Sequence, residues 1–172
     1  EVPVVVHVIH RGSPVGVDEN ISDAQVLSAL VALNEDFRKV AGSNGDGLGV
    51  DVFVEFVLAK RTPEGTPTTG IVRVDGTVVP GYASNGMASS SFLPGADQVA
   101  VKSLTTWYGD DYLNVFVVPE INGNNGGGGV QGFSYTGPTG DARDGVTLVY
   151  NAFGTTGTLK PVRTLHRTPT PH

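Results

Sequence analysis

Residues 144–172 read DGVTLVYNAFGTTGTLKPVRTLHRTPTPH. Asp144-Gly145 is typical of a turn, and Val146 to Tyr150 is a short run of β-branched and aromatic residues that predicts a central strand. Gly154 and Gly157 then interrupt regular structure. The stretch therefore predicts a buried strand, a glycine-rich loop and the approach to a helix, with the helix itself expected downstream.

Further strands are predicted upstream, separated by helices. Val2 to Ile9 is apolar almost throughout, which is typical of a strand covered on both faces. Strands that alternate with helices indicate a mixed sheet with crossover helices, and so an α/β or α+β fold. The other predicted segments are strands at 50–58, 112–118, 130–135 and 145–150, a short extended piece at 71–74, a long surface loop with a short helix at 75–95, and an irregular loop at 122–129.

Two helices are predicted from capping residues and apolar spacing. The first begins at the capping-box pattern Ser22-x-x-Gln25, has Asp23 at its positive end, and ends near Ala41-Gly42. The second covers residues 96–107. The predicted buried residues are Leu27, Leu30, Val31, Asn34 and Phe37 in the first helix, and Val99, Leu104 and Trp107 in the second.

Length and composition bound the class of protein. The 172 residues suit one domain with a real core. Lys plus Arg number 11 against 17 Asp plus Glu, a net charge of −6 that argues against nucleic-acid binding. No apolar stretch approaches the roughly 18–20 residues that cross a bilayer, so no membrane partner is predicted. The absence of cysteine excludes disulfides and thiolate zinc ligands.

Four histidines are the candidate metal ligands. His7 and His10 lie in and just after the first predicted strand, on opposite faces, so we expect structural roles for them. His166 and His172 lie in a proline-containing tail without the i, i+4 helical spacing of a zinc motif. The sequence contains no HExxH. No catalytic or metal-binding residue is therefore predicted in this chain.

Five segments of the chain occur in an order that is typical of one peptidase family. They are Val2–Ile9 (VPVVVHVI), Asn20–Gln25 (NISDAQ), Leu33–Arg38 (LNEDFR), Tyr112–Val118 (YLNVFVV) and Gln131–Tyr135 (QGFSY). Together they resemble the N-terminal half of the catalytic domain of pappalysin-type metzincin zinc metallopeptidases.

The tail fits the same resemblance up to its last two residues. Leu165 to His172 fits, in register, the run that leads into the family's zinc helix, HExxHxxGxxH. Pro171 and His172 stand where the family has its first zinc histidine and its general-base glutamate. The resemblance thus divides the chain into residues 1–164, an upper N-terminal subdomain, and residues 165–172, an irregular tail at the position of the zinc-helix start.

The resemblance implies a fold, an activity and a substrate site. The expected fold is a twisted, mixed five-stranded sheet with two packed helices, in a secreted zinc metalloendopeptidase. Zinc belongs to the complete family domain, and because HExxH is missing we expect this chain to be inactive alone. Gly132, Phe133, Ser134 and Tyr135 match the family's edge strand, which aligns a peptide or protein substrate by main-chain pairing.

A second interpretation stays open. The chain could be a non-catalytic secreted domain that uses a protease-like sheet for adhesion or self-assembly. If the family's active-site helix packs under the sheet, its absence leaves an apolar face uncovered. We therefore expect the chain alone to be marginally stable, to associate with itself, or to pair with a C-terminal half. The sequon Asn20-Ile21-Ser22 is interpreted as part of the helix start.

Overall fold

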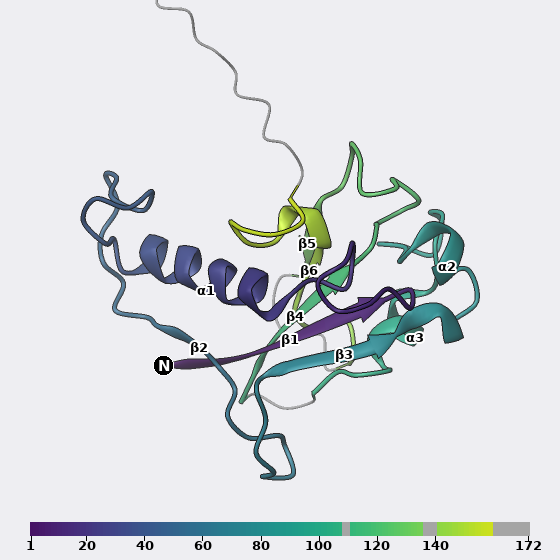
Figure 1. Cartoon of the computed structure of the whole chain (residues 1–172), viewed down its shortest axis with the longest axis horizontal. Helices are drawn as coiled ribbons and strands as arrows, with labels where there is room; N and C mark the ends of the chain where they lie inside the picture. Colours follow the sequence, from purple (N-terminus) through teal and green to yellow (C-terminus); the bar gives the residue numbers. More distant parts are fainter. Residues whose placement is uncertain (108–110, 136–140, 160–172) are drawn as a thin grey trace, which may run out of the picture.

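The computed structural model describes residues 1–107, 111–135 and 141–159 (Figure 1). A mixed sheet forms the middle of the molecule, with helices on both of its faces. None of the described helices is long and apolar enough to span a bilayer. The elements are β1 Val2–His10, α1 Asp23–Phe37, β2 Phe56–Leu58, β3 Ile71–Asp75, α2 Tyr82–Asn85, α3 Gln98–Lys102, β4 Leu113–Val118, β5 Gly132–Ser134 and β6 Val146–Val149, with short 3₁₀ helices at Gly76–Val78 and Tyr150–Ala152.

The sheet runs in the order β2-β1-β4-β6-β5, with β3 also paired to β1. All pairings are parallel except that of β5 with β6, which is antiparallel. β2 pairs with Val2–Val4 and β3 with Val6–His10, so the two strands share one edge of β1 in succession. The mixed α/β fold predicted from the sequence is confirmed, with six strands in place of the expected five because one edge position is divided.

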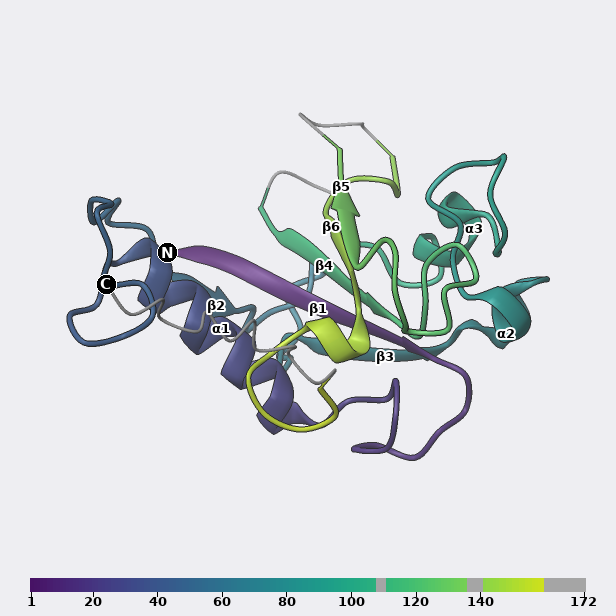
Figure 2. The same ribbon diagram turned by 90° about the horizontal axis from the view of Figure 1, so that it is seen from above.

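Two apolar clusters show which elements cover each face of the sheet. Val4, Val6 and Val8 of β1 pack with Val26 and Leu30 of α1. On the opposite face, Ile9 and Phe116 pack with Tyr82, Met87 and Val101, from α2, α3 and the segment between them. Figure 2 shows α1 on one side of the sheet, away from α2 and α3. The predicted loop at 75–95 contains the short helix that was expected there, α2, but it is not wholly a surface loop. It also covers the sheet, since Tyr82 and Met87 are buried in the core.

The buried side of α1 differs from the predicted stripe. Leu30 is buried as expected, but Leu27 is 50% exposed and Val31 57% exposed. The residues that pack on the sheet are Val26, Leu30 and Leu33, which keep helical spacing but are rotated from the predicted set. The helix also ends early, at Phe37 rather than at Ala41-Gly42.

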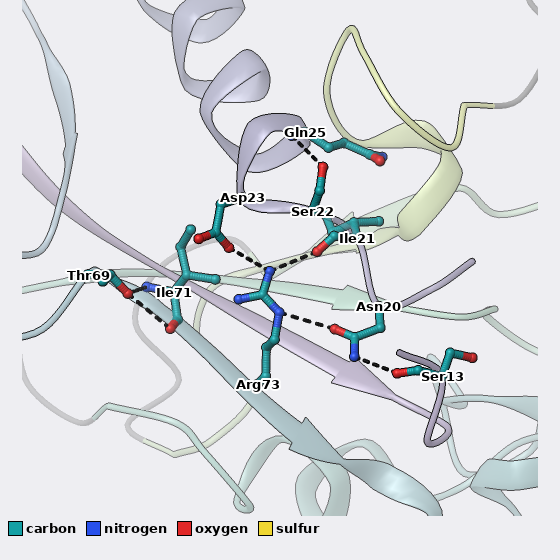
Figure 3. Close-up of polar contacts among 9 residues, drawn as sticks. All are labelled: Ser13, Asn20, Ile21, Ser22, Asp23, Gln25, Thr69, Ile71 and Arg73. Carbon is teal, nitrogen blue, oxygen red and sulfur yellow. Dashed lines mark hydrogen bonds and ion pairs between the residues drawn. The ribbon is translucent and has the colours of Figure 1, made fainter. Parts of the chain in front are cut away.

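Arg73 of β3 fixes the segment that leads into α1 (Figure 3). Its Nε donates to Asn20 Oδ1 at 3.1 Å, and its Nη2 donates to Ile21 O at 2.8 Å and to Asp23 Oδ1 at 2.7 Å. The Asn20 amide also donates to Ser13 O at 2.7 Å and is buried. The Asn20 side chain thus belongs to the helix start, and it is held there by its own hydrogen bonds.

The predicted strand at 50–58 is wrong over most of its length, because only Phe56–Leu58 pairs in the sheet. The Asp51 carboxylate accepts from Phe53 N at 2.7 Å and from Arg38 Nε at 3.0 Å. Phe53 adopts a left-handed φ of 55°. A side chain that bonds to nearby backbone in this way replaces the ladder that a strand would need.

The predicted helix at 96–107 is reduced to α3, residues Gln98–Lys102. Val99 and Leu104, which were expected inside, are each more than one third exposed, while Trp107 is half-buried. The buried residues of α3 are Gln98, Val101 and Lys102. Apolar spacing failed here because two polar side chains occupy the inner face.

Candidate functional site

The predicted substrate strand lies at the edge of the sheet. β5 contains three of the four predicted residues, Gly132, Phe133 and Ser134, and Tyr135 follows directly. β5 pairs only with β6, so within the described ranges no strand lies on its other side. An unpaired edge offers main-chain donors and acceptors to an extended peptide.

The pairing register decides which main-chain groups of β5 are free. Val149 N donates to Gln131 O at 2.9 Å, so residues 131 and 149 form a hydrogen-bonded pair. Hydrogen-bonded and non-hydrogen-bonded pairs alternate along an antiparallel ladder. Phe133 therefore faces β6 with its main-chain groups, while the N–H and C=O of Gly132 and Ser134 point away from the sheet.

The glycine-rich loop before β5 is irregular, as predicted, but it is held by buried polar groups. One Glu120 carboxylate oxygen accepts from Asn125 N at 2.6 Å, and the other pairs with Arg11. The Asn124 amide donates to Val130 O at 2.8 Å. These contacts fix the path of the chain into β5, which glycine content alone did not indicate.

An apolar groove of about 420 Å³ opens between α1 and the sheet. Its walls include Leu33 and Phe37 of α1, Leu113 and Val115 of β4, and Val146 and Leu148 of β6. Val146 and Leu148 are the register partners of Ser134 and Gly132, so the groove lies beside β5. Among the described residues, the groove is open and is lined mainly by apolar side chains.

Gln25 holds the loop that follows β6 against the start of α1. Its Nε2 donates to Phe153 O at 2.8 Å and to Tyr150 O at 3.0 Å, and its Oε1 accepts from Thr158 N at 3.0 Å. Ser28 Oγ accepts from Thr155 N at 2.9 Å. Phe153 and Thr155 also line the groove, so these bonds fix one of its walls.

The capping-box pattern was only half correct. Ser22 Oγ accepts from Gln25 N at 3.2 Å, which confirms the predicted cap. The Gln25 side chain, however, does not return to Ser22 and serves the loop at 150–159 instead. The sequence did not indicate that Gln25 bonds to the loop at 150–159. The S-x-x-Q pattern accounts for the glutamine by a contact with Ser22, and no residue near Gln25 in the sequence points to a partner more than 100 positions away.

His7 is a structural residue, as predicted. Its Nε2 lies 2.8 Å from Asn114 Oδ1 and its Nδ1 lies 2.9 Å from Thr105 Oγ1, and its ring stacks on Phe116. Burial lowers the pKa of His7 to about 4, so the ring is neutral near pH 7. Both ring nitrogens are engaged within the protein, which leaves neither for a metal ion.

The described residues do not fit a zinc site. No three His, Asp or Glu side chains gather within residues 1–107, 111–135 and 141–159 in a way that would hold a metal ion. His10 Nδ1 accepts from a backbone amide of the following turn. His166, His172 and the predicted tail at 165–172 lie outside the described residues.

The solved structures reported below, to which this chain is similar, are of the peptidase mirolysin. No family model matches it, and no curated protein matches it. Mature mirolysin of Tannerella forsythia in complex with a cleaved peptide is 30% identical, with a TM-score of 0.67, and the match covers 92% of this chain and 56% of that one. Mirolysin in complex with compound 9 gives 28% identity, a TM-score of 0.64, and 92% and 55% coverage.

A promirolysin mutant of Tannerella forsythia is similar at 29% identity, with a TM-score of 0.65 and coverage of 92% of this chain and 49% of that one. The chain thus spans about half the length of the solved structures that it matches. Mirolysin is a metzincin-type metallopeptidase. Over nearly all of its length, this chain has the fold of the corresponding part of a metzincin-type metallopeptidase.

Proposed function

We propose that this chain is the substrate-aligning half of the catalytic domain of a secreted, pappalysin-type zinc metalloendopeptidase. The observation that carries the proposal is the edge of β5, which is unpaired among the described residues, within a fold shared with a peptidase that was solved with a cleaved peptide. The pappalysin subfamily and secretion rest on the sequence resemblance. Zinc would be held by residues of the complete family domain.

The proposed role of β5 is to bind an extended peptide through main-chain hydrogen bonds. The outward N–H and C=O of Gly132 and Ser134 provide donors and acceptors at a spacing that matches one strand of peptide. The groove on the α1 face would then receive side chains or further polypeptide beside the bound strand. Substrate selection by sequence would depend on parts of the complete domain.

The role of β5 is tested by removing one outward donor. Ser134→Pro deletes the N–H that faces solvent and leaves the ladder to β6 intact, while Ser134→Ala keeps that N–H. A mixed-sequence fluorescein-labelled octapeptide is titrated into residues 1–172, and its twin with alternate N-methylated amides serves as the probe control. One lost hydrogen bond of about 1 kcal/mol corresponds to roughly fivefold weaker binding.

Two outcomes would contradict this role. Equal affinity of Ser134→Pro and Ser134→Ala would show that the outward amide takes no part in binding. Equal affinity for the octapeptide and its N-methylated twin would show that recognition does not use main-chain pairing.

A non-catalytic role in adhesion or self-assembly is the second candidate. It is favoured by apolar side chains displayed on the segment after α1, among which Leu48, Val50 and Phe53 are each more than three quarters exposed. Under this alternative the chain would assemble through that segment and bind neither octapeptide. Leu48→Ser and Phe53→Ser would abolish assembly, and a monomeric chain at high concentration would exclude the alternative.

A further inference from the structure

Two polar side chains of α3 lie under the edge strand. Gln98 and Lys102 are one helical turn apart, and both are buried. Gln98 Nε2 donates to Tyr135 Oη at 2.7 Å. Lys102 Nζ lies 5.4 Å from the centroid of the Phe133 ring. Gln98 and Lys102 thus contact Tyr135, which directly follows β5, and Phe133 of β5. At i and i+2 of an extended chain, these two side chains lie on the same side.

Lys102 connects four parts of the fold at one atom. Its Nζ donates to Arg143 O at 2.9 Å, in the segment before β6, and lies 4.7 Å from the Phe116 ring centroid in β4. Because it also lies over the Phe133 ring, the Lys102 ammonium group links α3 to β4, to β5 and to the segment before β6. An apolar side chain could fill the same space without the cost of burying a charge. The contribution specific to Lys102 is the set of directed contacts that its ammonium group makes.

We infer that Gln98 and Lys102 are positioning residues that hold β5 with its free edge presented for main-chain pairing. The inference rests on the proposed function, in which β5 binds an extended peptide. A three-residue strand with a single neighbour has little to fix its tilt. Lys102 and Gln98 of α3 contact Phe133 and Tyr135 on one face of the strand. Gly132 and Ser134 are exposed on the other face.

The charge state of Lys102 supplies a test that a purely structural role would not pass. Burial lowers the pKa of Lys102 to about 8, and the carboxylates of Asp144 and Asp141 act in the opposite direction. Arg143 lies over the Tyr135 ring beside this group. His7, which stacks on Phe116, has a pKa of about 4 and is uncharged above pH 7.

The sign of the two pH effects differs. The folded-state pKa of Lys102 is below its unfolded value, so the unfolded chain binds more protons between about pH 8 and pH 10.5, and this group makes the fold more stable as pH rises. In the folded chain, the ammonium charge is lost as pH rises through about 8, and the cation–π contact with Phe133 is lost with it. Peptide affinity should therefore fall above pH 8 while this group does not lower the stability of the fold.

The experiment compares residues 1–172 carrying Lys102→Met, Lys102→Arg or Tyr135→Phe with the wild type, using the octapeptide. Lys60→Met, at an exposed lysine, is the matched control, and Val26→Ala, in the α1-side core, controls for lost stability. We expect roughly fivefold weaker binding for Lys102→Met. Lys102→Arg should restore most of the affinity and keep it at pH 9.5. Tyr135→Phe, a milder change, should weaken binding less.

Hydrogen exchange separates this inference from the proposed function. In Lys102→Met, the Phe133 amide, which faces β6 in the ladder, should exchange at least about tenfold faster, with the α1 amides unchanged. Unchanged exchange there would overturn the positioning role, whether or not the octapeptide binds. If exchange is faster in Lys102→Met but the wild type does not bind the octapeptide, the proposed function is contradicted and the positioning role is not. Wild-type affinity in a folded Lys102→Met chain would also overturn the inference.

Discussion

Replacing Gln25 by alanine should destabilise the chain by about as much as removing a large core side chain would. The Gln25 amide is buried and makes three hydrogen bonds of 3.0 Å or less, to Phe153 O, Tyr150 O and Thr158 N, with a longer one of 3.4 Å to Thr158 O. Gln25→Ala removes all of them and leaves the backbone groups without their partner.

The expected magnitude follows from the number of bonds. At about 1 kcal/mol net for each short bond, Gln25→Ala should lower the free energy of unfolding by about 3 kcal/mol. For a chain of this size, that corresponds to a fall in Tm of roughly 6–12 °C. Gln25→Glu keeps the acceptor for Thr158 N but turns a carboxylate toward two carbonyl oxygens. Its deficit should grow as pH rises, because burial raises the pKa of the introduced carboxyl group.

Urea unfolding measures the loss, and hydrogen exchange locates it. Glu35→Ala is the matched control, since Glu35 lies on the same helix and makes no side-chain hydrogen bond or ion pair among the described residues. Exchange of the Thr158 and Thr155 amides should rise in Gln25→Ala and not in Glu35→Ala. A difference in unfolding free energy below about 1 kcal/mol between the two variants would refute the role assigned to Gln25.

Three further changes test other parts of the structure. Gly154→Ala should destabilise more than Gly12→Ala, because both have a φ of +96° but only a Cβ at Gly154 would meet Gln25 O, at 2.6 Å; equal losses in urea unfolding would contradict this. His7 has a folded-state pKa of about 4, so the unfolded chain binds more protons at this residue between pH 6.5 and pH 4. The wild type should therefore lose roughly 3 kcal/mol of stability as pH falls across that range. Urea denaturation of His7→Gln at the same pH values should lack this slope. Ala32→Glu, in the groove wall, should leave the assembly proposed for the segment after α1 unchanged in sedimentation experiments, whereas a loss of association would place the contact in the groove instead.

The strands that the sequence predicted best are the most buried ones. Val2 to Ile9 and Leu113 to Val118 are apolar except at His7 and Asn114, and both form central parallel strands covered on two faces. The cap at Ser22 was also predictable, since a cap depends on residues within one helical turn. In these places the local pattern and the tertiary environment require the same residues.

The errors fall where a distant partner decides the local structure. Arg38 and Asp51 form an ion pair that turns the chain before β2, and no pattern within residues 50–58 indicates it. Lys102 is buried because rings from β4 and β5 meet its ammonium group. An amphipathic helix prediction places lysine outside, so it reversed the two faces of α3. The edge position of residues 132–135 was expected from the family resemblance, and their composition alone did not indicate it.

The two faces of the sheet differ in how they are covered beside β5. On the α3 face, Gln98 donates a hydrogen bond to the Tyr135 hydroxyl and Lys102 lies over the Phe133 ring. The side of β5 that carries these rings is therefore already covered by α3. On the α1 face, the groove is apolar and open, and its wall is set by the bonds of Gln25. Apolar surface that is open to water gains free energy when it is covered. A bound strand on β5 together with additional polypeptide should therefore be accommodated on the α1 face, with the α3 face acting as the rigid support that keeps the edge of β5 in place.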